Sequence, residues 1–157
     1  MEKIRRAVGA VIIRKPDQIL LVKKVRTEDV DFRQKDILPE WDIPKGGIHE
    51  GESFLFALKR ELKEEVGTSD FILIRKLPFE LCFTFPVGKR YDRQITELGL
   101  LFGLDNAYVS RTNEIAEVSW FGFENAKQIV TYPSTKELID KVKILVRTIH
   151  VDRFSEK

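Results

Sequence analysis

The stretch "GGIHEGESFLFALKRELKEEVG" decides the fold of this chain and runs from Gly46 to Gly67. Three of its glutamates, Glu61, Glu64 and Glu65, have the spacing of neighbours on a helix. Like charges at this spacing repel one another and weaken a helix. Because alternating Glu and Lys would serve folding better, the pattern indicates that a positive group sits beside these carboxylates in the working protein.

The same stretch marks the limits of one helix. Its glycine-rich start, residues 46–52, predicts a constrained loop, and Ser53 can cap the helix that follows. We expect the helix to end near Val66, with Gly67 in its C-terminal cap. At about 100° per residue an apolar stripe forms for the core, made of Leu55, Leu58, Leu62 and Val66. The glutamates are expected on the adjoining face, at the edge of that core.

Outside this stretch, strand and helix signals are interleaved. Strands are expected at residues 7–14, 18–25, 41–44, 71–85, 94–105 and 117–123, and further helices at 124–130 and 134–150. A long polar segment, 26–40, predicts a loop, and residues 86–93 predict the turn of a hairpin. The order predicts an α/β fold with a mixed β-sheet between helices, in one domain over residues 1–157.

The composition excludes some classes of function. The 157 residues are 43% hydrophobic and 33% charged, with a net charge of +2. This near neutrality gives no support for bulk binding to membranes or long nucleic acid, so any affinity for phosphate must be local. Cys82 is the only cysteine, which rules out an intrachain disulfide and suits a reducing compartment. The apolar residues around Cys82 predict that its side chain is buried. The short apolar run 7–13 predicts a strand rather than a signal peptide, so we expect a cytoplasmic protein. Its expected oligomeric state is a monomer or a homodimer.

Three carboxylates at a junction between a loop and a helix suit a hard divalent cation. Mg²⁺ prefers oxygen ligands and usually keeps water and substrate phosphates in its shell. Such an ion polarises a phosphate and activates water. The residue types therefore predict metal-assisted cleavage of a phosphate anhydride.

The spacing of the whole stretch resembles the signature of the Nudix hydrolases. The matching positions are Gly46, Glu52, Arg60-Glu61-Leu62, Glu64-Glu65 and Gly67, eight of the nine that define the signature. Thr68 departs from it, since the family usually has an aliphatic residue there, but its methyl group can still pack. The resemblance implies an α/β/α sandwich that uses Mg²⁺ or Mn²⁺ to hydrolyse a nucleoside diphosphate linked to another group.

The resemblance also implies roles for the residues of the signature. Glu61 and Glu65 would bind the metal directly, and Glu64 directly or through water. The backbone of Lys45 and Gly46 would help at the metal.

Two further parts of the machinery follow from the same resemblance. Arg60 and Glu52 would pair and orient the cluster. A further acid before the last strand would bind metal or act as the base, and we favour Glu114 over Glu117, with Glu61 as the alternative base.

Several side chains are candidates for contact with a nucleotide substrate: Trp41, Lys45, Phe83, Lys89, Arg90, Tyr91 and Tyr132. Aromatic rings can stack on a base, and the basic hairpin 89–93 can meet phosphates. The alternatives stay open, because aromatic side chains also fill cores and hairpin tips are often charged for solubility alone.

Two local similarities bear on the substrate. Residues 41–53, "WDIPKGGIHEGES", resemble a segment of diadenosine polyphosphate hydrolases and of bacterial RNA pyrophosphohydrolases, and residues 117–141 resemble the tail of the first group. The expected order is diadenosine tetraphosphate, cleaved to ATP and AMP, then nucleoside triphosphates, then ADP-ribose and RNA 5′ ends. The alternative of a different class is a regulator that binds a nucleotide without turnover.

Overall fold

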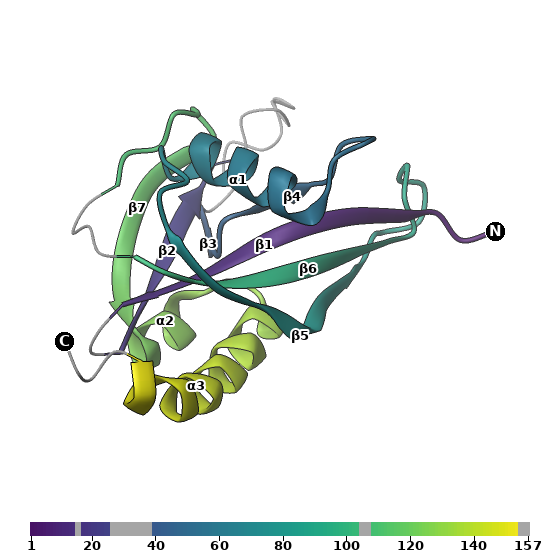
Figure 1. Ribbon diagram of the computed structural model, residues 1–157. Coiled ribbons are helices and arrows are strands. Elements are labelled where there is room, and N and C mark those ends of the chain that lie inside the picture. The colour runs from purple at the N-terminus through teal and green to yellow at the C-terminus, as the bar shows by residue number, and fades with distance from the viewer. Residues whose placement is uncertain (15–16, 26–38, 104–107, 154–157) are drawn as a thin grey trace.

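The computed structural model describes residues 1–14, 17–25, 39–103 and 108–153. Within them a seven-stranded sheet forms the middle layer (Figure 1). Its strands are β1 (Ile4–Arg14), β2 (Gln18–Lys24), β3 (Glu40–Asp42), β4 (Lys45–Gly47), β5 (Ile72–Thr84), β6 (Arg93–Phe102) and β7 (Ile115–Gly122). The helices are α1 (Phe54–Glu65), α2 (Phe123–Ile129) and α3 (Pro133–Arg153).

The sheet is mixed, as the sequence predicted. Its main order is β3-β2-β1-β6-β5, while β4 pairs with β1 and β7 pairs with β2. Strands β1 and β6 are parallel and the other pairs are antiparallel. Strand β1 pairs with β4 at residues 7–9 and with β2 at residues 13–14. This division places β4, which carries Lys45 and Gly46, on β1 beside the second half of α1.

Helices cover both faces of the sheet, which confirms the expected α/β/α sandwich (Figure 1). Leu58 and Leu62 of α1 are buried against one face, and Leu138 and Val142 of α3 against the other. Each fully buried leucine contributes about 1.5–3 kcal/mol relative to an exposed one. No helix in the described ranges combines the length and apolar character needed to cross a membrane.

Both ends of α1 form as predicted. The Ser53 hydroxyl accepts a hydrogen bond from the Phe56 N–H at 3.2 Å. Gly67 has a φ of +92°, and a Cβ there would lie 2.1 Å from the carbonyl oxygen of Val109. Glycine is therefore required both by the left-handed conformation and by the loop that packs against the helix end.

The prediction for Leu55 is wrong, because its side chain is 42% exposed whereas Leu58 and Leu62 are buried. Leu55 lies in the first turn, at the border of the buried stripe. The stripe is rotated toward the acids, so Glu61 and Glu65 are themselves buried, each 8% exposed. The carboxylates thus lie within the packed face of α1 rather than beside it.

Two other sequence predictions are wrong. Gly46 and Gly47 belong to β4 and pair with Val8 and Ala7, so the loop begins only after them. Cys82 is exposed, because β5 lies at the edge of the sheet. Most of the predicted loop 26–40 lies outside the described residues.

Candidate active site

The pair of Glu52 and Arg60 that the sequence predicted is present. The Arg60 guanidinium donates to both Glu52 carboxylate oxygens, from Nε at 2.7 Å and from Nη2 at 2.8 Å. The backbone N–H of His49 donates to the same carboxylate at 2.7 Å. The hydrogen bonds from Arg60 lower the pKa of Glu52 to about 2. The loop before α1 is therefore fastened to the middle of the helix.

Arg60 also contacts two other glutamates and the backbone of β4. Its Nη1 donates to Glu61 at 2.7 Å and lies 3.6 Å from Glu64, while its Nη2 donates to the carbonyl oxygen of Gly47 at 2.8 Å. The carboxylates raise the pKa of Arg60 above its ordinary value. Burial raises the pKa of Glu61, and the hydrogen bond from Arg60 opposes that rise.

Glu65 lies at the other end of the cluster, and its charge is offset by weaker contacts than those of Glu52 and Glu61. One oxygen accepts a hydrogen bond from the backbone N–H of Lys45 at 3.1 Å, and the other lies 3.9 Å from the ammonium of Lys24. Desolvation raises the pKa of Glu65 to about 7, although Lys24 counteracts it. Among the described residues, Glu65 therefore has only one cation, the Lys24 ammonium, 3.9 Å away, to offset its buried carboxylate.

Gly46 lets the backbone of β4 approach the cluster. A Cβ at this position would lie 2.1 Å from the carboxyl carbon of Glu61. Any side chain would displace that carboxylate, so the space beside Glu61 depends on glycine.

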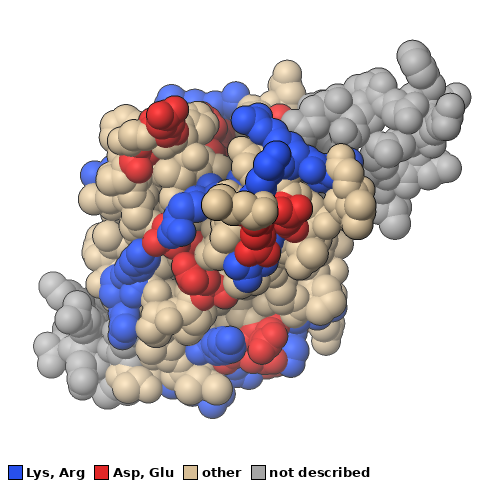
Figure 2. All heavy atoms as spheres, turned by 90° about the vertical axis from the view of Figure 1, so that its right-hand side faces the viewer, with Lys and Arg blue, Asp and Glu red and all other residues tan. Residues whose placement is uncertain are grey.

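A cleft of about 820 Å³ opens over the cluster. Five of its acidic lining residues are Glu40, Glu61, Glu64, Glu65 and Glu114. Five basic residues that share the lining are Arg5, Lys24, Lys45, Lys63 and Arg111. Figure 2 shows acidic side chains on this side of the molecule with basic ones beside them. The cleft can therefore take a cation and a phosphate chain side by side.

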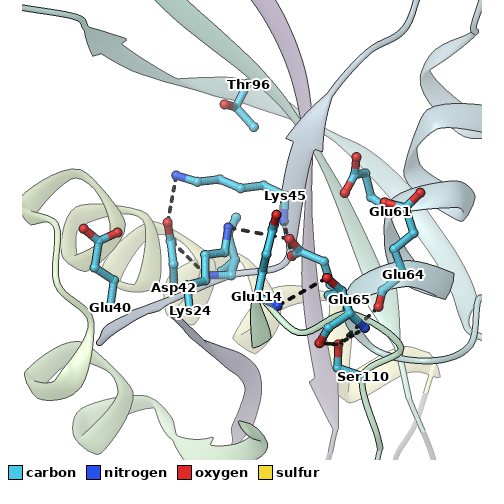
Figure 3. Close-up of polar contacts among 12 residues, drawn as sticks. Lys24, Glu40, Asp42, Lys45, Glu61, Glu64, Glu65, Thr96, Ser110 and Glu114 are labelled. Atoms are coloured by element: carbon cyan, nitrogen blue, oxygen red, sulfur yellow. Dashed lines mark hydrogen bonds and ion pairs between the residues drawn. The ribbon is translucent and has the colours of Figure 1, made fainter. Parts of the chain in front are cut away.

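The segment before β7 brings Glu114 into this cleft (Figure 3). The backbone N–H of Arg111 and the hydroxyl of Ser110 donate to the carbonyl oxygen of Glu64, at 3.0 and 3.2 Å. The Val25 N–H donates to the carbonyl oxygen of Glu114 at 2.7 Å. Glu117 instead lies in β7 opposite Lys23, outside the lining of the cleft. The placement suits Glu114 better than Glu117, and its role stays a prediction.

The donor chemistry of the cluster fits Mg²⁺ or Mn²⁺, because carboxylates and a backbone carbonyl are hard oxygen donors. Among the described residues, however, no three acidic, histidine or cysteine side chains converge enough to hold an ion as they stand. Glu61 is directed at Arg60, and Glu65 at Lys45 N–H and Lys24. Binding of an ion therefore requires these side chains to turn toward it.

Three of the predicted substrate contacts lie at the cleft and its border. Lys45 lines the cleft, and its ammonium lies 5.6 Å from the ring centroid of Tyr132. The Tyr132 hydroxyl donates to Glu40 at 2.7 Å, and its ring meets that of Phe83 at 6.4 Å. Phe83 and Tyr132 thus form an aromatic pair beside Lys45.

The remaining predicted contacts are more distant. Tyr91 lines a second cleft, of about 670 Å³, and neither cleft is lined by Lys89 or Arg90. The Trp41 ring packs edge-on against Phe121 at 5.0 Å. Contacts of these residues with substrate stay predictions.

Sequence reasoning missed Lys24 and Asp42. Among the described residues Lys24 is the cation that pairs with Glu65, and only the order of the strands brings it there. Asp42 is 1% exposed and pairs with the Lys45 ammonium at 2.8 Å. Asp42 and Lys45 are three residues apart, on either side of Pro44, and this spacing could have predicted the pair.

Known proteins resemble this chain in sequence and in fold. The NUDIX domain family model matches residues 3–142. An RNA pyrophosphohydrolase of Campylobacter jejuni subsp. jejuni serotype O:2 is 33% identical over 130 residues, 80% of each chain.

Two solved structures share the fold. The MutT protein of Methanosarcina mazei Go1 aligns with a TM-score of 0.69 at 18% identity, covering 89% of this chain and 93% of that one. A C. elegans Ap4A hydrolase, solved as a binary complex, aligns with a TM-score of 0.65 at 21% identity, covering 92% and 98%.

Proposed function

Because the chain belongs to the NUDIX family and is a Nudix pyrophosphohydrolase, we propose that it hydrolyses a phosphate anhydride at the 5′ end of RNA. The observation that carries this proposal is the cleft in which Glu61, Glu64 and Glu65 lie among cationic side chains. The name of the relative that is 33% identical supports RNA as the first candidate substrate.

Nudix hydrolases generally use a divalent metal such as Mg²⁺ or Mn²⁺. In this chain Glu61, Glu64, Glu65 and the backbone of Gly46 and Lys45 would hold it. When bound, the ion supplies positive charge that polarises a phosphate and activates water.

The other side chains of the cleft have distinct tasks in this proposal. Arg60 orients Glu61 and fixes the loop through Glu52. Glu114 takes the proton of the attacking water, which it must reach directly or through one further water. The water oxygen bonds to phosphorus, and the bond from that phosphorus to the bridging oxygen breaks.

Cations in the cleft reconcile an RNA substrate with the small net charge of the chain. We expected no long nucleic acid partner, because the net charge is only +2. However, Arg5, Lys24 and Arg111 line the same cleft. A 5′ end that carries several phosphates would be attracted to this local charge, with few contacts needed further along the strand.

Diadenosine tetraphosphate, cleaved to ATP and AMP, is the second candidate. The pair formed by Phe83 and Tyr132 beside Lys45 favours it, because a purine can stack on an aromatic ring. The second adenosine would project into solvent. Nucleoside triphosphates and ADP-ribose follow in the order of candidates.

A substrate panel tests the proposal. The purified protein with Mg²⁺ is given a 5′-triphosphorylated oligonucleotide, diadenosine tetraphosphate, ATP and ADP-ribose at equal concentrations. We expect the highest kcat/KM for the oligonucleotide, with a 5′-monophosphate product, and turnover at least ~10²-fold lower with the Glu65→Gln variant. A higher value for diadenosine tetraphosphate would favour the second candidate. Binding without turnover of any compound would indicate a regulator.

Hydrolysis in ¹⁸O-water identifies the phosphorus that is attacked. The label is expected on the phosphate group that accepts the water oxygen, and mass spectrometry of both products locates it.

A further inference from the structure

Asp42 is a buried carboxylate that lies just outside the cleft. One oxygen accepts hydrogen bonds from the Ile43 N–H at 2.8 Å and from the Thr135 hydroxyl at 3.1 Å. The other oxygen pairs with the ammonium of Lys45 at 2.8 Å. Since Asp42 is 1% exposed and does not line the cleft, it cannot contact a substrate itself.

Lys45 faces two anionic groups from one position in the chain. Its backbone N–H donates to Glu65, whereas its side chain extends to Asp42, away from Glu61 (Figure 3). Without Asp42, this ammonium would be drawn to the other carboxylates that line the cleft, which are Glu40 and the acids of the cluster. An ammonium among those acids would compete with a metal ion and would be lost to the substrate.

We infer that Asp42 is a positioning residue that holds the Lys45 ammonium at the cleft wall, where it binds a phosphate of the substrate. A lysine ammonium has three donors, so Asp42 leaves donors for phosphate oxygens. The Lys45 side chain is 22% exposed and lines the cleft, so these donors are accessible. This inference rests on the proposed function for its ligand class, a nucleoside 5′-polyphosphate.

The start of α3 fixes the strand that carries Asp42. Thr135 bonds to Asp42, the Thr131 hydroxyl accepts from the Trp41 N–H at 3.0 Å, and Tyr132 donates to Glu40. All three residues of β3 are therefore tied to the segment that leads into α3. Because three separate contacts hold β3, loss of the Thr135 hydrogen bond alone should leave the strand and the pair of Asp42 and Lys45 in place.

The test measures how Asp42→Asn acts with and without Lys45. Asparagine keeps an oxygen for Ile43 and Thr135 but cannot accept a bond from Lys45 at the other position. The probe is the Mg²⁺ complex of α,β-methylene-ADP, whose bridging carbon resists hydrolysis. Its Kd is measured by calorimetry, beside kcat and KM for the substrate that the wild type turns over.

We expect Asp42→Asn to raise Kd and KM by about 3- to 10-fold and to change kcat less than about 2-fold. Lys45→Met should raise them by ~10-fold. The double variant should match Lys45→Met, because Asp42 acts through that lysine. Thr135→Val is the matched control: it removes another partner of Asp42, so it should lower Tm and leave Kd unchanged.

Three results would overturn the inference. The first is an unchanged Kd in Lys45→Met. The second is that Asp42→Asn raises Kd as much in the Lys45→Met background as it does in the wild type. The third is a rise in Kd with Thr135→Val as large as with Asp42→Asn. The first result decides the matter even if Asp42→Asn does not fold. Failure of the proposed function is distinguishable, because it would appear as no turnover of the 5′-triphosphorylated oligonucleotide by the wild type, while the pattern of Kd values is still measured.

Discussion

The two ends of the glutamate cluster differ in how their charge is compensated. Glu52 accepts two hydrogen bonds from the Arg60 guanidinium, and its pKa falls to about 2. Glu65 is buried, and its ion-pair partner among the described residues, the Lys24 ammonium, lies 3.9 Å away; its pKa rises to about 7. One carboxylate is satisfied by the protein, whereas the other would be stabilised by an added cation.

This difference separates the carboxylates that build the site from those that work in it. A charge that the protein itself compensates belongs to the structure, because its removal leaves a partner unpaired. A buried charge with weak compensation costs stability and is retained at functional sites. Glu52 belongs to the first kind and Glu65 to the second.

The largest effect is expected for Glu65→Gln, which should lower turnover by at least ~10²-fold, because a metal ligand contributes several kcal/mol of transition-state stabilisation. Stability without metal should not fall, since a desolvated charge is removed. Steady-state kinetics and thermal unfolding with and without Mg²⁺ measure both. Glu50→Gln, in the exposed loop, is the control. Near-wild-type rates of Glu65→Gln and Glu64→Gln at saturating Mg²⁺ would contradict the metal assignment.

Gly46→Ala is expected to lower kcat by ~10-fold or more with a smaller effect on folding, because its Cβ would displace the Glu61 carboxyl group. Gly47→Ala is the matched control. A Cβ there would meet only the flexible guanidinium end of Arg5, at 2.8 Å, so a modest effect is expected. Equal kinetics of the two variants would show that the close approach at Gly46 is not needed.

Arg60→Ala should lower both rate and stability, with Tm falling by roughly 5–10 °C, because Glu52 and the Gly47 carbonyl lose their donor. Glu64→Gln, by contrast, should affect rate with little change in Tm. Calorimetry of both variants beside Lys59→Ala, an exposed site on the same helix, provides the comparison. An unchanged Tm in Arg60→Ala would mean that the pair contributes nothing to folding.

The smallest effect concerns pH. The pKa of Glu52 is about 2 in the folded protein and 4.5 as its ordinary value. The stability that its pair contributes is therefore fully present above pH 4.5 and is lost as pH falls toward 2. The difference in unfolding free energy between wild type and Glu52→Gln should stay constant from pH 7 to 5 and shrink below 4.5. Urea unfolding at each pH tests this, and a pH-independent difference would contradict the shifted pKa.

The sequence predicted the limits of α1 and the pair that fastens its preceding loop, because these interactions are local. Ser53, Gly67 and the pair of Glu52 and Arg60 lie within one short stretch, where spacing alone sets the geometry. The prediction for Leu55 was wrong because a stripe of apolar residues does not show how far the sheet extends beneath the helix. Cys82 was misjudged because strand order decides which strand lies at an edge.

By itself, the sequence determined the fold class, the family and the set of carboxylates, since the pattern that encodes them is contiguous. Only the tertiary structure decided which cations face those carboxylates. Lys24 reaches Glu65, and Thr135 reaches Asp42, through the pairing of the sheet and the docking of α3. The physical reason is that compensation of a buried charge depends on distances between segments remote in sequence, and these are fixed only when the core packs.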